Sequence, residues 1–178
     1  MTIVEERAMF DCEVRAIEPD VIAWRRHLHQ NPEVSFEEVA TTLWLEARLR
    51  EIGVDSIDRP TKTGLVAHIH GKKPGRCAVV AFRADIDALP MQEENDLPYC
   101  SNNAGVMHAC GHDGHTTMLL GAARYLAETR NFDGRIAVIF QPAEEGGGGR
   151  GERPSGERPD HRGRRVPRHQ RGRDDEVA

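Results

Sequence analysis

The sequence has no long hydrophobic run, few aromatic residues and few cysteines. No stretch approaches the roughly 18 apolar residues of a membrane-spanning helix, so we expect no membrane association of that kind. The first ten residues carry Glu5, Glu6 and Arg7 where a signal peptide would have a basic start and an apolar stretch, which predicts a cytoplasmic protein. In that compartment four widely spaced cysteines do not form a disulfide framework.

The C-terminal segment, residues 150–178, lacks large apolar side chains: it contains no Phe, Trp, Tyr, Leu, Ile or Met. It holds nine arginines against six acidic residues, so it carries +3 and the remaining chain −8 of the total −5. A segment with so little to bury cannot offset the conformational entropy that ordering removes. We therefore expect residues 1–149 to fold and residues 150–178 to form a disordered tail rich in Arg, Gly and Pro.

Two helices are predicted before the first strand. The first covers residues 18–30 and ends at an Asn-Pro pair, because the residue before a proline disfavours the helical conformation. The second has the spacing of a capping box, Ser35 with Glu38 three residues on, and Gly53 stands at the position of a C-terminal cap. Its apolar positions are Val39, Leu43, Leu45 and Leu49.

Three short apolar runs bounded by turn residues are predicted strands: Leu65–His70, Cys77–Phe82 and Ile136–Phe140. The run Cys77–Phe82 is apolar throughout, which is typical of a central strand covered on both faces. A helix is predicted over residues 113–129, and the order strand, helix, strand favours an α/β sheet with a crossover. The inner side of this helix is predicted to carry Met118, Leu119, Ala122, Ala123 and Leu126.

Two loops after predicted strands hold most candidate catalytic residues, and open α/β sheets place their sites at such loops. In one loop, Cys110 and His112 flank a glycine and offer a thiolate and an imidazole, which Zn²⁺ accepts. In the other, Glu144 and Glu145 are adjacent, and paired carboxylates repel unless a positive charge such as a metal ion is near. Spacing alone also permits an ordinary thiol and imidazole, and a solvated acidic turn.

Asp85 follows the strand Cys77–Phe82 at the same edge of the predicted sheet. Its carboxylate could orient a ligating imidazole, since metal-bound histidines commonly donate their second N–H to such a group. An ion pair with the neighbouring Arg83 accounts for this residue equally well.

Four segments of the chain resemble, in order and spacing, the M20 family of metallopeptidases and amidohydrolases. The similarity is greatest to its N-acyl-amino-acid amidohydrolase branch, which includes hippurate hydrolases and auxin-conjugate hydrolases. The four segments are RRHLHQNPE (25–33), FRADIDALP (82–90), HACGHDGH (108–115) and FQPAEEG (140–146).

The resemblance implies the N-terminal half of a zinc-exopeptidase-like α/β/α sandwich and a two-metal amide hydrolase. Its substrates would be N-acyl amino acids or short peptides, and its cofactors two divalent ions, Zn²⁺ or Mn²⁺. By the resemblance, Cys110, His112 and Glu145 are metal ligands and Glu144 is the general base. The base would take a proton from the attacking water and return it to the leaving amine.

The sequence departs from the family after residue 149. Family members continue with a further ligating histidine, a lid domain that makes dimer contacts, and a last histidine ligand, none of which is recognisable here. Our hypothesis is a frameshift or a truncated gene, because out-of-frame GC-rich sequence tends to encode Arg, Gly and Pro. We expect an exposed strand edge, weak metal binding and little or no hydrolysis by this chain alone.

Two other hypotheses remain from the sequence. One is a non-catalytic metal-binding or interaction module whose basic tail contacts an acidic partner such as nucleic acid. The tail has no aromatic residues for base stacking and six acidic residues, so we do not favour nucleic acid as the partner. The other is a subunit fragment that completes its site with a separate chain.

Overall fold

The computed structural model describes residues 3–75, 78–148, 157–159 and 165–167. It has a mixed α/β fold, as the sequence predicts. The helices are α1 (Ile3–Gln30), α2 (Val39–Ile52) and α3 (His112–Thr129), with a π-helical turn η1 (Glu144–Gly148). The strands are β1 (Ser56–Asp58), β2 (Leu65–His70), β3 (Val79–Asp85), β4 (Arg135–Gln141), β5 (Glu157–Pro159) and β6 (Arg165–Pro167).

The main sheet has four strands in the order β1-β2-β4-β3. The pairs β1–β2 and β2–β4 are antiparallel, whereas β3 and β4 are parallel and are joined through α3. In register, Ala67 of β2 lies opposite Val138 of β4, and Val138 lies beside Phe82 of β3. The predicted crossover is confirmed, and it brings the carboxyl ends of β3 and β4 to the same edge of the sheet.

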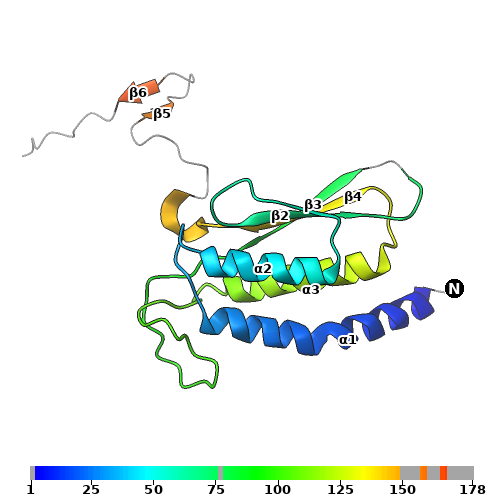
Figure 1. Cartoon of the computed structure of the whole chain (residues 1–178), viewed down its shortest axis with the longest axis horizontal. Coiled ribbons are helices and arrows are strands. Elements are labelled where there is room, and N and C mark those ends of the chain that lie inside the picture. The colour runs from blue at the N-terminus through cyan, green and yellow to red at the C-terminus, as the bar shows by residue number, and fades with distance from the viewer. Residues whose placement is uncertain (1–2, 76–77, 149–156, 160–164, 168–178) are drawn as a thin grey trace, which may run out of the picture.

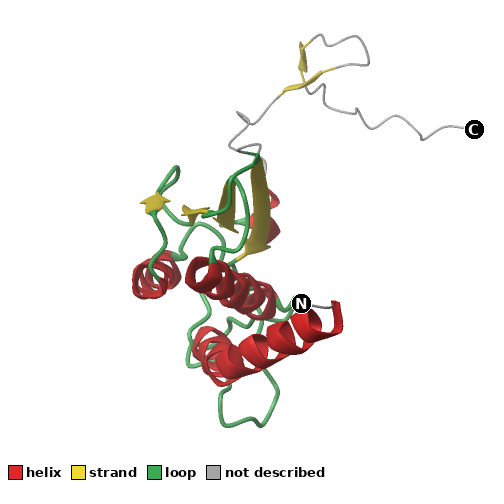
Figure 2. Cartoon of the chain, turned by 90° about the vertical axis from the view of Figure 1, so that its right-hand side faces the viewer, coloured by secondary structure: helices red, strands yellow, loops and turns green. Residues whose placement is uncertain are grey.

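The helices lie on one side of the sheet in two layers (Figures 1 and 2). α2 and α3 pack against the sheet, and α1 packs on the far side of α3. The close approach of α1 and α3 uses Gly121, where an added Cβ would lie 2.9 Å from the Val21 side chain. The core between sheet and helices is formed chiefly by Leu45, Leu49, Leu65, Ile69, Ile86, Leu120, Val138 and Phe140.

The predicted capping box at the start of α2 is wrong. Ser35 Oγ instead donates to Asp87 Oδ2 at 2.7 Å, and the fully buried Glu38 accepts from the Ala143 backbone N–H at 2.8 Å. The Glu33 carboxylate accepts from the first amides of α2 in their place. The side chains of Ser35 and Glu38 therefore form tertiary contacts instead of the capping box that the local pattern predicts. The glycine cap at the other end is confirmed: Gly53 has φ 83°.

Three further expectations need correction. α1 begins at Ile3 and contains Pro19, so it is longer than residues 18–30. β3 is an edge strand, with Val79 55% and Phe82 46% exposed, and is not covered on both faces. Met118 and Ala122, both expected on the inner side of α3, are exposed, Met118 to 63%. Phe82 and Met118 share one cause, because no described element packs beyond β3 to cover this side of α3.

The predicted disorder of residues 150–178 falls mostly outside the described residues. Within that segment the structure describes β5 and β6, which pair antiparallel. Across the described part of the chain, no helix combines the length and the apolar character needed to cross a membrane.

Candidate metal centre

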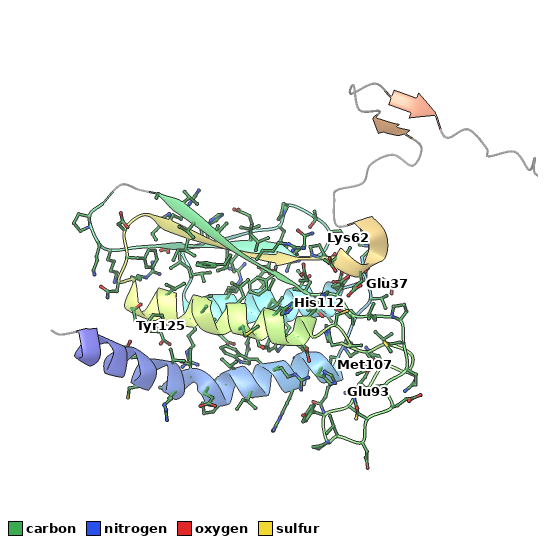
Figure 3. The ribbon with its side chains drawn as sticks, turned by 180° about the vertical axis from the view of Figure 1, so that it is seen from behind. Glu37, Lys62, Glu93, Met107, His112 and Tyr125 are labelled. Atoms are coloured by element: carbon green, nitrogen blue, oxygen red, sulfur yellow. The ribbon has the colours of Figure 1, made fainter. Side chains whose placement is uncertain are left out.

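Three segments meet at the carboxyl edge of β3 and β4: the turn after β3, the start of α3, and η1 after β4. Figure 3 shows His112 at this junction, with Glu93 and Met107 in the long connection that precedes α3. The arrangement follows from the parallel pairing, because loops that leave neighbouring parallel strands emerge side by side. The loops that the sequence singled out are thus adjacent in space.

His112 is buried and held by Asp87. Its Nδ1 lies 2.9 Å from the Asp87 backbone oxygen and 3.1 Å from Asp87 Oδ1. Both partners are acceptors, so Nδ1 donates, and Nε2 is the ring nitrogen left for a ligand. Nε2 faces the η1 turn, 3.8 Å from Glu145 Oε1. This is the orientation in which an imidazole binds a metal ion while its other nitrogen is anchored.

Glu145 connects the predicted ligands. Its backbone N–H donates to Asp87 Oδ2 at 2.9 Å, which fixes the start of η1 against the turn after β3. Its carboxylate accepts a hydrogen bond from the Cys110 thiol, and this bond raises the pKa of Cys110 above the ordinary value. Glu145 therefore lies beside both Cys110 and His112, although Cys110 does not belong to the groups of described residues whose possible ligand atoms all lie within 4.8 Å of one another.

The donor set fits a divalent cation. Suitable ligand atoms of His112, Glu144 and Glu145 lie within 4.8 Å of one another. Among the residues that the structure describes, no lysine or arginine forms an ion pair with Glu144 or Glu145, so their charges lack a cationic partner from the protein. A borderline ion such as Zn²⁺ accepts thiolate, imidazole and carboxylate and would supply that charge.

A second group of possible ligand atoms overlaps the first. Asp85, His112 and His115 also place such atoms within 4.8 Å of one another. Arg83 forms an ion pair with Asp85. The hydrogen bond to the imidazole that we expected of Asp85 is made by Asp87. The Asp85-x-Asp87 spacing in the sequence indicates two candidate carboxylates near the end of one strand. Only the fold decides which of the two reaches His112.

A buried ionic cluster, which the sequence analysis did not find, lies beside the site. His29 at the end of α1 contacts Asp113 Oδ2 through Nδ1 at 2.7 Å and Glu93 Oε1 through Nε2 at 3.1 Å. Arg25 Nε lies 2.9 Å from the same Asp113 oxygen. We name Arg25, His29, Glu93 and Asp113 the α1–α3 cluster. The contacts join residues up to 84 positions apart, so no local spacing in the sequence predicts them.

His108 lies between the α1–α3 cluster and the candidate ligands. It is buried, and both of its ring nitrogens lack a hydrogen-bond partner among the described residues. Burial is the main cause that lowers the pKa of His108 to about 4, although the nearby Asp113 opposes the shift. The ring is therefore neutral at pH 7 and adds no charge to the site.

Comparison with known proteins agrees with this geometry. The model of peptidase family M20/M25/M40 matches residues 81–165, which include most of β3, all of α3 and β4, and all the candidate ligands. The N-acyl-L-amino acid amidohydrolase of Geobacillus stearothermophilus is 53% identical over 133 residues, 74% of this chain. The N-terminal part of this chain belongs to the M20 family. The family match runs to residue 165, whereas the departure from the family predicted from the sequence lies after residue 149.

Other M20 relatives give the same result. The hippurate hydrolase of Campylobacter jejuni is 49% identical over 125 residues, 70% of this chain. The crystal structure of YXEP from Bacillus subtilis, a dinuclear metal-binding peptidase from the M20 family, superposes with a TM-score of 0.69 at 47% identity over 74% of this chain. The chain spans about a third of the length of these relatives: 35% of the first, 32% of the second and 37% of the third.

Proposed function

We propose that this chain provides the N-terminal part of a metal-dependent hydrolase that cleaves the amide bond of N-acyl amino acids. The observation that carries the proposal is the ligand cluster at η1, where His112, anchored by Asp87, faces Glu145 and Glu144. The names of the 53% and 49% identical relatives, an N-acyl-L-amino acid amidohydrolase and a hippurate hydrolase, support the reaction class.

In this proposal Cys110, His112 and Glu145 hold a divalent ion. A bound ion supplies positive charge that polarises the substrate carbonyl and makes a nearby water more acidic. Asp87 keeps the His112 proton on Nδ1, so that Nε2 stays available as a ligand. Zn²⁺ and Mn²⁺ both suit the donor set, and a second ion would require ligands beyond these three.

Glu144 is the general base in the proposal. Its side chain lies at the start of η1, next to the ligand Glu145. The side chain is exposed, so a water molecule can reach its carboxylate from solvent. It takes a proton from the attacking water and delivers that proton to the nitrogen of the leaving amine. The products are a carboxylic acid and a free amino acid.

Metal analysis and a hydrolysis assay on the same preparation test the proposal. We expect the chain to bind Zn²⁺, Glu145→Gln to weaken binding about tenfold or more, and Glu144→Gln to leave affinity within about threefold. With N-benzoylglycine we expect little or no turnover by this chain alone. Failure of the wild-type chain to bind Zn²⁺ or Mn²⁺ would overturn the metal centre.

Turnover of N-benzoylglycine tests the role of Glu144 independently of metal binding. Hydrolysis of N-benzoylglycine that Glu144→Gln reduces about a hundredfold or more would support the base and show that our expectation of low activity is wrong. Hydrolysis that survives Glu144→Gln would contradict the role of this residue. The alternative of a non-catalytic module with a basic tail rests on residues 150–178, most of which lie outside the described part of the chain.

A further inference from the structure

The α1–α3 cluster joins three parts of the chain that are distant in sequence. His29 comes from α1, Glu93 from the connection before α3, and Asp113 from the first turn of α3, and all three are at least 92% buried. Each ring nitrogen of His29 lies within hydrogen-bond distance of a carboxylate oxygen, and Arg25 Nη2 lies 3.3 Å from Nδ1. Two buried carboxylates thus converge on one buried imidazole, and Arg25 at the edge of the cluster supplies a positive charge.

Asp113 directly follows the candidate ligand His112. One of its oxygens contacts His29 and Arg25, and the other accepts from the Gly114 N–H at 2.8 Å. These contacts fix the direction in which α3 begins. On the other side, Cys110 is exposed and an added Cβ on Gly111 would meet nothing within 4 Å, so little side-chain packing surrounds these two residues.

The Cys110–His112 segment is therefore fixed at its ends rather than by packing along its length. Asp87 holds the ring of His112 on one side, and the α1–α3 cluster holds Asp113 on the other. Gly111, with φ 83°, gives the chain between them rotational freedom that other residues lack. Loosening the Asp113 anchor changes where the Cys110 sulfur and the His112 Nε2 lie relative to Glu145.

We propose that His29, together with Arg25, is a positioning residue for the metal centre: through Asp113 it sets the geometry in which Cys110 and His112 present their ligand atoms. The inference rests on the proposed function, because it needs the metal centre. It differs from a plain stabilising role, since the contact to Asp113 matters for the ligands whereas the contact to Glu93 holds the 93–101 loop.

Two substitutions of one residue separate these roles. The amide nitrogen of Asn lies near the position of the histidine Nδ1, so His29→Asn keeps a donor toward Asp113. The longer Gln reaches the position of Nε2, so His29→Gln keeps a donor toward Glu93 and loses the one toward Asp113. His68→Gln is the matched control, because His68 pairs with Asp58 at 3.1 Å on β2 and β1, outside the site.

Titration of the full 178-residue chain with Co²⁺ is the test, read by absorbance, since a thiolate on Co²⁺ gives a charge-transfer band that reports Cys110. We expect His29→Gln to lose affinity about tenfold or more and to lose or shift that band, with His29→Asn and His68→Gln within about threefold of wild type. Arg25→Gln, at a partly exposed side chain, should weaken binding in the same direction and serves if His29→Gln does not fold.

Three results would overturn the inference. His29→Gln or Arg25→Gln could keep both the wild-type affinity and the wild-type band. His29→Asn and His29→Gln could lose affinity equally and in step with their thermal stability, which is the behaviour of a purely structural residue. If the wild-type chain itself does not bind Co²⁺, the proposed metal centre is wrong and this inference fails with it. The wild-type titration therefore separates failure of the metal centre from failure of the positioning role of His29.

Discussion

At the scale of single residues, the buried carboxylates separate into two environments. Asp87 accepts from Ser35, His112 and the Glu145 backbone, so it joins three segments of the chain at the site. Glu93 belongs to the α1–α3 cluster. Burial opposes the ionisation of Glu93, but hydrogen bonds from the Ser101 N–H, Asn95 and His29 outweigh it and lower its pKa to about 2.

The low pKa of Glu93 predicts a pH dependence of stability. A carboxyl whose pKa is lower in the folded chain stabilises the fold above its unfolded value, 4.5, and that stabilisation is lost as the pH falls towards 2. Glu93→Gln removes this contribution, so we expect the difference in unfolding free energy between wild type and variant to be largest above pH 5 and to shrink towards pH 2. Urea denaturation at a series of pH values measures it, and a difference that does not change with pH would contradict the prediction.

At the scale of elements, α3 shows how an apolar pattern divides between core and surface. Leu120 is fully buried against the sheet, whereas Met118 is 63% exposed and lines a groove of about 510 Å³ beside β3 with Phe82 and Leu126. Periodicity marks both residues as apolar positions of a helix. Only the packing of α3 against β3 and β4 determines which of them the sheet covers.

Paired truncations in α3 test this division. Leu120→Ala should lower the unfolding free energy by about 2–5 kcal/mol, because it removes a buried side chain and leaves a cavity. Met118→Ala should change it by less than about 0.5 kcal/mol, because the side chain is mostly in solvent. Chemical denaturation of both variants decides the matter, and a Met118→Ala loss as large as that of Leu120→Ala would show that Met118 belongs to the core.

At the scale of the whole molecule, β3 is one of the two edge strands of the described four-stranded sheet, and it carries large exposed apolar side chains. Val80 and Phe82 lie on the helix side, in register with the buried Ile136 and Val138, yet are 50% and 46% exposed. Val79 points to the opposite face and is 55% exposed. An open strand edge with apolar side chains on both faces favours pairing with another polypeptide.

Self-association through this edge is therefore expected. The purified chain should form larger species as its concentration rises, and Phe82→Lys should reduce them with little loss of stability, because the residue is half exposed. Leu43→Lys is the control, since Leu43 is equally apolar and 54% exposed but lies on α2. Sedimentation velocity measures both. Equal suppression by the two variants would mean that general surface hydrophobicity, and not the β3 edge, drives association.

The sequence by itself determined the helices and strands that have strong local patterns, and the residue types of the site. The strand Leu65–His70 is confirmed at both ends, and α3 begins one residue before the predicted boundary. The four motifs identified the M20 family. These features are local: periodicity, a glycine cap, and ligand-type residues within a few positions of one another.

Only the tertiary structure decided which partners these residues have. Ser35 contacts Asp87, and Glu38 contacts the Ala143 backbone, so the two do not form a capping box. Asp87 is the carboxylate that holds His112, and β3 lies at an edge of the sheet. It also assembled His29, Glu93 and Asp113 into one buried cluster. The physical reason is that burial and charge pairing join residues tens of positions apart, and a buried polar group takes whichever partner the packed elements bring within hydrogen-bond distance.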